Sequence, residues 1–365
     1  MSDPGEPITA NEIRLDHNGS LALITLQRPR ALNALTVAMR ESMAAWFPKF
    51  SRDPNVYAVA IRSAAAKAFS AGSDVREVTA LGRTGMQAAR KAFSDEYALN
   101  WRLECFSKPT VSLIDGVVMG GGVGISLYGT HRVAGESYRF AMPETKIGLF
   151  PDVGVAHALA RMPDEIGVYL GLTGHAVGRA DAFALGLVTH CIPLGQFDDI
   201  IAALADAQPV DPLLDNRHVD PGPGELDAKR ETIARCFSAS DVTGIVTRLQ
   251  NETGPGADWA RETASDLNKR SPLSLAVTLR HLRESRSRDL REVLQMDYRL
   301  ACRFLEDVDF YEGVRAVIED KDNDPKWQPA SHAAVTAAMI ERYFAPLEGD
   351  VWSLPTRTDM QAMRA

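Results

Sequence analysis

The most apolar stretch of the sequence runs from Thr110 to Gly129, and it is interrupted by Asp115 and dense in glycine. Its first part, Thr110 to Ile114, has the short apolar pattern of a buried strand. Residues Gly116 to Gly124 follow, and their glycines predict a tight turn into a buried helix. A segment broken in this way does not have the continuous apolar length of a membrane span. We therefore predict a fold organised around a buried strand, a turn and a helix.

Strand and helix patterns alternate on both sides of this segment. Helical spacing begins after Thr36 and recurs from about Gly85 to Phe106. Strand patterns occur at residues 21–26, 57–62, 131–134 and 139–142. This order predicts an α/β architecture with layered short strands.

The composition changes after Ile192. Residues 208–224 hold several Pro and Gly among Asp and other polar residues, which predicts a linker. From residue 225 to about 345 the pattern is helical, with Ser271 and Pro272 as a cap and first-turn proline. We therefore expect a core domain over 12–207, a linker over 208–224, a helical region over 225–345 and a flexible tail over 346–365.

Charge and cysteine usage narrow the class of protein. A formal net charge of −8 argues against nucleic-acid binding, although local basic residues can hold one phosphorylated ligand. The start, Met1 to Pro7, is acidic and lacks the features of a secretory signal or transit peptide, so we expect a cytoplasmic location. The cysteines have no metal-ligand spacing and are expected to be reduced thiols. They are Cys105, Cys191, Cys236 and Cys302.

Three segments carry a family resemblance by their order and spacing. They are Leu26-Gln27-Arg28-Pro29 with Asn33-Ala34-Leu35, then Phe69 to Asp74, then Asp115-Gly116 through Met119 to Gly122. Together they resemble the crotonase (enoyl-CoA hydratase/isomerase) superfamily. The resemblance implies a spiral core of ββα repeats, a helical C-terminal region that closes over the site, and an acyl-CoA substrate. It implies no metal or redox cofactor, because coenzyme A is part of the substrate.

Other glycine and serine motifs fit less well. The glycines do not follow the G-x-G-x-x-G spacing of a dinucleotide site. Ser126 lies in Gly124-Ile125-Ser126-Leu127-Tyr128, which is not the G-x-S-x-G elbow of a serine hydrolase.

Thioester chemistry develops negative charge on the carbonyl oxygen, and two converging backbone N–H groups stabilise that charge. The resemblance assigns these donors to Ser73 and Gly121, where glycine lets the backbone approach a ligand. The alternative is that Gly120 to Gly122 only forms a tight turn. The resemblance places the coenzyme A nucleotide near Arg28 to Leu32 and Ala71 to Asp74. The substrate-binding residues that it implies are Arg30, Ala31, Leu32, Ala71, Asp74, Glu96, Gly120 and Gly124.

The acidic residues separate the branches of the superfamily. Hydratases of the superfamily activate water with two glutamates. In this chain Gly124 stands at the position of the first glutamate, and Glu144, in the run from Ala141 to Gly148, stands at the position of the second. The run from Phe150 to Gly154 adds Asp152 and resembles the hydroxyisobutyryl-CoA hydrolase branch. In that branch the residue matching Glu144 is the nucleophile or the base. The residue matching Asp152 orients the substrate hydroxyl or shares the proton. The residue matching Glu96 contacts the substrate.

If the carboxyl groups of Glu144 and Asp152 lie close together, both cannot ionise freely, so one pKa should rise. Purely structural roles remain open for two of the acids. Asp152 could be the N-cap of the helix that follows it, and Glu96 could lie on an exposed helix face.

The resemblance extends over roughly residues 12–330 and includes Leu172-Thr173-Gly174 and the run from Phe310 to Ile318. It implies hydrolysis of 3-hydroxyisobutyryl-CoA, an intermediate of valine breakdown. The chain departs from the branch at Ser73, where glycine is usual, and at Val155 to Ala158, where a glycine-rich, aromatic stretch is usual. Both departures bear on the shape of the acyl pocket.

Two other functions remain open. One is enoyl-CoA isomerisation or hydration, although Gly124 offers no second glutamate and is expected to leave space beside the acyl group. The other is a catalytically silent CoA-binding paralogue, which retention of both Glu144 and Asp152 disfavours. Crotonases often form trimers, so a homo-oligomer is possible. No nucleic-acid or membrane partner is expected.

Overall fold

The computed structural model describes residues 12–349 and 352–363. Residues 1–7, which carry the expectation of a cytoplasmic location, lie outside this range, as do parts of the expected tail. Within the described residues no helix is both long enough and apolar enough to cross a bilayer.

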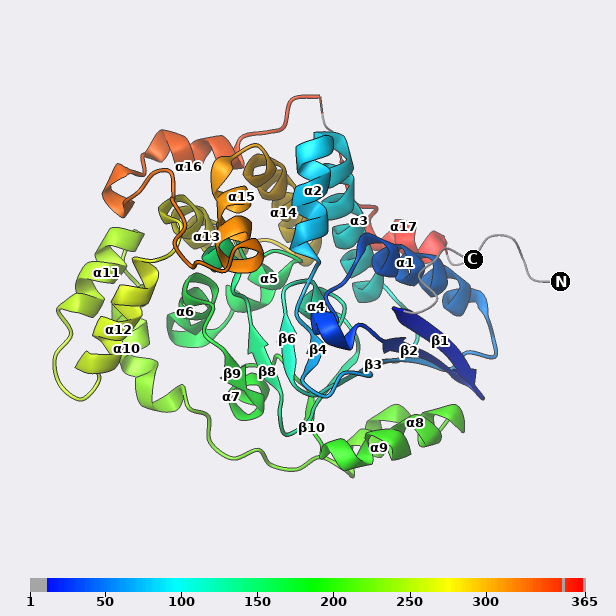
Figure 1. Cartoon of the computed structure of the whole chain (residues 1–365). Helices are drawn as coiled ribbons and strands as arrows, with labels where there is room; N and C mark the ends of the chain where they lie inside the picture. Colours follow the sequence, from blue (N-terminus) through cyan, green and yellow to red (C-terminus); the bar gives the residue numbers. More distant parts are fainter. Residues whose placement is uncertain (1–11, 350–351, 364–365) are drawn as a thin grey trace.

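Two sheets of short strands form the centre of the protein (Figure 1). The six-stranded sheet has the order β1-β2-β3-β5-β7-β10, and the four-stranded sheet has the order β4-β6-β8-β9. The pairs are parallel except β1 with β2 and β8 with β9. The strands are β1 (Ile13–Asn18), β2 (Leu21–Leu26), β3 (Ala58–Ser63), β4 (Ala68–Ser70), β5 (Thr110–Ile114), β6 (Val117–Met119), β7 (His131–Ala134), β8 (Arg139–Ala141), β9 (Val177–Gly178) and β10 (His190–Cys191).

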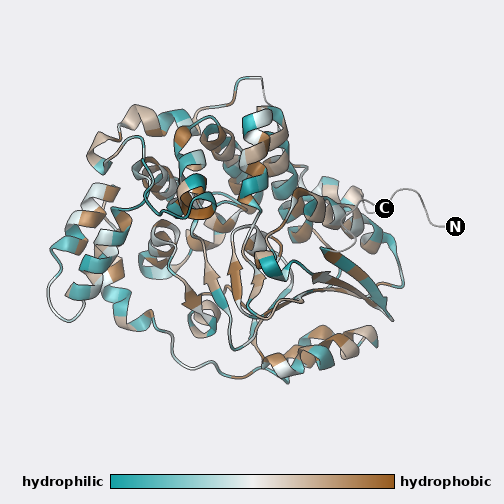
Figure 2. Ribbon diagram, viewed as in Figure 1, coloured by the Kyte–Doolittle hydropathy of each residue, from teal (hydrophilic) through white to brown (hydrophobic). Residues whose placement is uncertain are grey.

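The strands occur in successive pairs, with one member in each sheet. β3 is followed by β4, β5 by β6 and β7 by β8, and helices separate one pair from the next. The chain therefore winds as a spiral of ββα units, and the predicted α/β spiral core is confirmed. The central strands β2 and β5 are buried at every residue, as expected for parallel strands covered on both faces. Figure 2 shows the central strands mostly brown and the outer strand β1 largely teal.

Helices cover both faces of the sheets. The helices of the core are α1 (Val37–Arg52), α2 (Val75–Thr84), α3 (Met86–Glu104), α4 (Gly121–Gly124), α5 (Val155–Leu159), α6 (Ile166–Thr173), α7 (Arg179–Ala184), α8 (Phe197–Ala205) and α9 (Val210–Asp215). Helices α8 and α9 pack on one face of the six-stranded sheet, through residues such as Ile200 and Leu214. The main core lies on the other face. As predicted, α1 begins after Thr36, whose hydroxyl oxygen accepts from Met39 N at 3.2 Å.

The C-terminal region is helical, as expected. Its elements are α10 (Arg230–Phe237), α11 (Val242–Gln250), α12 (Ala257–Leu267), α13 (Pro272–Ser285), α14 (Leu290–Leu305), α15 (Val308–Val314), the π-helical turn η7 (Arg315–Glu319), α16 (Ala337–Phe344) and α17 (Arg357–Ala362). Ser271 caps α13 and Pro272 is its first residue, as predicted. In Figure 1, α13 to α16 gather with α2 and α3 on one side of the sheets, opposite α8 and α9.

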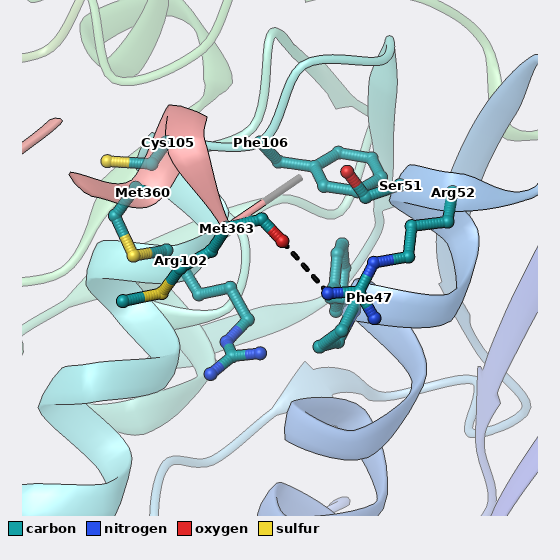
Figure 3. A pocket seen from close by; sticks show the side chains of 9 residues that line it. Phe47, Ser51, Arg52, Arg102, Cys105, Phe106, Met360 and Met363 are labelled. Carbon is teal, nitrogen blue, oxygen red and sulfur yellow. Dashed lines mark hydrogen bonds between the residues drawn. The ribbon is translucent and has the colours of Figure 1, made fainter. Parts of the chain in front are cut away.

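Two segments are more ordered than the sequence suggested. Residues 210–215 of the expected linker form α9, because its apolar residues Val210, Leu213 and Leu214 are buried against the sheet. Residues 352–363 of the expected tail pack against α3: Trp101 Nε1 donates to the Pro355 carbonyl at 2.9 Å. A cavity of about 220 Å³ lies between α17 and residues of α1 and α3. Figure 3 shows side chains that line it and the hydrogen bond, 2.8 Å long, that Arg52 donates to the Met363 carbonyl.

Candidate active site

A cavity of about 170 Å³ lies where the core meets the C-terminal helices. Its walls come from the turn after β4, the start of α4, the 3-10 turn η3 (Glu144–Ile147), α2, α15 and η7. Six residues that the sequence singled out line it: Ala71, Ser73, Gly120, Gly121, Glu144 and Asp152. Residues separated by up to 81 positions in the sequence therefore line one cavity.

Two backbone turns with left-handed glycines form one wall. Gly72 has φ +102° and Gly120 has φ +47°, conformations that residues with a Cβ rarely adopt. A Cβ added to Gly121 would lie 3.1 Å from Ser73 N, so the two turns are in close contact. Within the described residues, neither Ser73 N nor Gly121 N donates to another protein group. Both amides are thus available to one ligand oxygen.

Glu144 is the first residue of η3, directly after β8 and Pro143. Its Oε2 is buried without a hydrogen-bond partner, and its Oε1 lies 3.1 Å from the position of a Cβ on Gly120. Burial raises the pKa of Glu144 to about 8, and the negative charge of Glu96 adds to this effect, while a backbone hydrogen bond opposes it. A fraction of the carboxyl is therefore ionised at neutral pH, as a base or nucleophile requires.

Asp152 is buried beside the same cavity, and Tyr97 Oη donates to its Oδ2 at 2.8 Å. Burial, followed by the negative charges of Glu96 and Glu144, raises the pKa of Asp152 well above its ordinary range. The alternative role as a helix cap is wrong. Helix α5 begins at Val155 with Gly154 as its N-cap, and the Asp152 side chain turns to Tyr97 instead.

Glu96 lies on α3 and is buried, so its placement on an exposed helix face is wrong. It accepts from Ser73 Oγ at 2.5 Å and pairs with Arg40 at 2.9 Å, with both charged side chains 3% exposed. Glu96 does not line the cavity. Its place is behind the Ser73 turn, where a buried ion pair fixes the position of one of the two amides.

The predicted nucleotide-binding residues Arg30, Ala31, Leu32 and Asp74 do not line this cavity. They lie next to its wall, because Ala71 N donates to the Leu32 carbonyl at 2.9 Å and Asp74 N donates to that of Leu35 at 2.9 Å. These two backbone bonds hold the turn after β4 against the segment that follows β2.

Gly124 does not line the cavity either, and the expectation that it leaves space beside the acyl group is wrong. A Cβ there would meet Asn100 Nδ2 at 2.7 Å and Val153 Cβ at 3.0 Å. Side chains from α3 and from the segment before α5 therefore fill the place that a glutamate would occupy.

Two buried residues of the C-terminal region were missed by the sequence analysis. Asp297 on α14 and His281 on α13 are completely buried, with Oδ1 and Nε2 2.8 Å apart. Asp297 Oδ2 also accepts from Gly154 N at 2.6 Å, and its charge contributes to the raised pKa of Asp152. A signal was present: Asp297 lies on the same helical face as Leu290, Val293, Leu294, Leu300 and Ala301.

The family model "Enoyl-CoA hydratase/isomerase" matches residues 21–344. Curated proteins similar to this chain include "3-hydroxyisobutyryl-CoA hydrolase, mitochondrial" of Homo sapiens, 39% identical over 93% of this chain and 89% of that protein. The "3-hydroxyisobutyryl-CoA hydrolase 1" of Arabidopsis thaliana is 36% identical over 98% of both chains.

Solved structures similar to this chain have other names. A carnitinyl-CoA dehydratase from Mycobacterium thermoresistibile is 35% identical, with a TM-score of 0.88 over 93% of this chain and 98% of that one. An enoyl-CoA hydratase from Rhodobacter sphaeroides 2.4.1 is 38% identical, with a TM-score of 0.85 over 92% of this chain and 98% of that one. Proteins named as hydrolases and proteins named as hydratases or dehydratases are both similar to this chain, so the geometry of the site has to distinguish the two reactions.

Proposed function

This chain belongs to the enoyl-CoA hydratase/isomerase family, and from that premise we propose that it hydrolyses the thioester of a short 3-hydroxyacyl-CoA. The substrate supported best is 3-hydroxyisobutyryl-CoA, which yields 3-hydroxyisobutyrate and CoA, a step of valine breakdown. The hydrolase relatives that match more than 90% of the chain support this reaction. The observation that carries it is the buried carboxyl of Glu144, whose Oε2 has no hydrogen-bond partner, beside two free backbone donors.

Ser73 N and Gly121 N would hold the thioester oxygen and stabilise the charge that develops on it; each such donor is typically worth about 2.7–4 kcal/mol of barrier. Ionised Glu144 then has two possible roles. As a nucleophile it attacks the carbonyl carbon, CoA leaves as a thiolate, and water opens the resulting anhydride. As a base it takes a proton from the water that attacks the carbonyl directly. Both routes end with the free acid, CoA and a regenerated Glu144.

Asp152 is suited to a different task. Burial and its acidic neighbours raise the pKa of Asp152, which favours the protonated form, and one carboxyl oxygen can exchange hydrogen bonds with the 3-hydroxyl of the substrate while Tyr97 holds the other. Protonated Asp152 also avoids a second negative charge next to Glu144. Every step uses groups of the chain and water, and we propose that no metal or redox cofactor takes part.

Enoyl-CoA hydration is the second candidate, because the solved relatives carry hydratase and dehydratase names. Hydration needs a water held between two carboxylates near the β-carbon. The position of the first hydratase glutamate is Gly124, and Asn100 and Val153 fill the space around it. This packing favours hydrolysis.

A panel of acyl-CoA esters tests the proposal by release of free thiol. We expect 3-hydroxyisobutyryl-CoA and 3-hydroxypropionyl-CoA to be cleaved, and isobutyryl-CoA, which lacks the hydroxyl, to be cleaved much more slowly. Equal rates for the hydroxylated and unhydroxylated esters would remove Asp152 from substrate recognition. Absence of thiol release from the whole panel would refute the hydrolase.

Single turnover in ¹⁸O-water separates the two routes. Label in the Glu144 carboxyl is expected if water opens an anhydride at the enzyme carbonyl. Label only in the acid product would leave direct attack by water, or opening of the anhydride at the substrate carbonyl.

A further inference from the structure

A second cavity, of about 350 Å³, adjoins the catalytic cavity. The two share Met119, Pro143 and Lys146 as wall residues, so the segment around η3 separates them. The far wall comes from the C-terminal region, where α12 contributes Trp259 and the chain just before α10 contributes Lys229. In Figure 1, α10 and α12 lie beside α6, which forms the third side.

The charged groups of this cavity are mostly cationic. Lys146, Lys229 and Arg270 line it, together with Glu262 and Asp266. Asp266 is also bound to Lys269 at 2.9 Å, outside the cavity. Asp266 also faces Lys146 and Arg270, so the three cations exceed the two carboxylates of the cavity by one charge.

Two of these cations lie close together and are incompletely paired. Burial lowers the pKa of Lys146, and the positive charge of Arg270 lowers it further. Arg270 donates through one guanidinium nitrogen to the Thr173 carbonyl at 3.2 Å, but its buried Nε has no hydrogen-bond partner. A buried guanidinium N–H without an acceptor is costly, and an anion bound beside it would offset that cost.

Hydrolysis of a thioester creates such an anion. The acid product carries a new carboxylate, which is formed next to Glu144 and Asp152, where an ionised Glu144 disfavours a second negative charge. On the far side of Pro143 the same carboxylate would meet Lys146 and Arg270. Lys146 lines both cavities and Arg270 lines only the second, so a carboxylate that passes the shared wall gains a further cationic partner.

We propose that this second cavity binds the small hydroxycarboxylate product, separately from coenzyme A. The carboxylate pairs with Arg270 and Lys146, Lys229 adds to the attraction from the rim, and the Trp259 ring covers the apolar part of the acid. The proposal rests on the proposed function for the identity of the anion. It gives the acid a binding site that CoA does not occupy.

Direct binding of 3-hydroxyisobutyrate, measured by calorimetry on the full chain with and without saturating CoA, tests this. We expect the same Kd for the acid in both conditions. Arg270→Gln should raise that Kd about tenfold, the usual scale for one charge-assisted hydrogen bond, and Lys229→Gln should raise it by a smaller factor; both should leave the Kd of CoA unchanged. Arg261→Gln on the outer face of α12 is the matched control, because Arg261 is exposed and does not line the cavity.

Three results would overturn the proposal: no saturable binding of the acid to the wild-type chain, mutual exclusion of acid and CoA, or unchanged acid binding in both variants. Weakened CoA binding in Lys229→Gln would instead assign the cavity to the nucleotide. Lys229 is only half-buried, so this variant stays informative if Arg270→Gln fails to fold. Thiol release should be measured on the same preparation, because it separates the two proposals. If the chain binds the acid but cleaves no thioester, the proposed acid-binding site stands and the proposed hydrolase function is refuted.

Discussion

Replacement of Glu144 by glutamine should separate stability from activity. Glu144 is fully buried, and its pKa rises from an ordinary 4.5 to about 8 in the folded protein. At a pH between these two pKa values, Glu144 holds its proton in the folded protein and loses it in the unfolded chain. The favourable contribution is therefore complete below pH 4.5, and it falls as the pH rises, until the folded group also ionises near pH 8. Glutamine cannot ionise, so the variant escapes this loss.

The magnitude follows from the two pKa values. At about 1.36 kcal/mol per pKa unit, the free energy of unfolding of the wild type should fall relative to Glu144→Gln by about 2–3 kcal/mol between pH 5 and 7. A further loss of about 1 kcal/mol is expected between pH 7 and 9, after which the stabilities of the two proteins should run in parallel.

Denaturant unfolding of both proteins at pH 5, 7 and 9 measures this difference, with Glu41→Gln on the exposed face of α1 as the matched control. Turnover of Glu144→Gln should fall about 10²-fold or more while ester binding stays within about tenfold. A constant stability difference across the pH range would refute the burial of an ionisable Glu144. Near-normal turnover would remove it from the mechanism.

Other predictions follow from the same geometry. Asp152→Asn should lose thiol release without a lower melting temperature, because Asp152 does not cap α5; a destabilised but fully active variant would contradict this. Gly121→Ala should lower kcat about 10²–10³-fold, since its Cβ would run into Ser73 and Glu96, whereas Gly85→Ala, with open space around it, should be neutral. Equal kcat values for these two variants would refute the role of the Ser73 and Gly121 amides. Dialysis against EDTA should leave thiol release unchanged, and activity restored only by added metal would contradict the metal-free mechanism.

Local sequence signals predicted the elements that local chemistry determines. The strand at 131–134, the caps at Thr36 and Ser271, and the turns that contain Gly72 and Gly120 each depend on residues only a few positions apart. Such signals also located Glu144 and Asp152 at the ends of short segments, because the motifs that carry the family resemblance lie in those segments.

Contacts between distant segments were not predictable in this way. The sequence gives no sign that Glu96 faces Arg40 and Ser73, which lie 56 and 23 positions away, since helix orientation depends on packing. The filling of the space at Gly124 by Asn100 and Val153 is also tertiary. Buried Asp297 was detectable on an apolar helix face, but its partner on α13 was not.

The central claim is that this site cleaves a thioester rather than hydrating a double bond. One enzyme preparation should be given 3-hydroxyisobutyryl-CoA, followed by thiol release, and crotonyl-CoA, followed by loss of the enoyl absorbance. We predict thiol release much faster than hydration, because no glutamate stands at Gly124 to hold the second water contact. Efficient hydration of crotonyl-CoA with negligible thiol release would contradict the account, and double-bond migration as the sole activity would assign the chain to the isomerases.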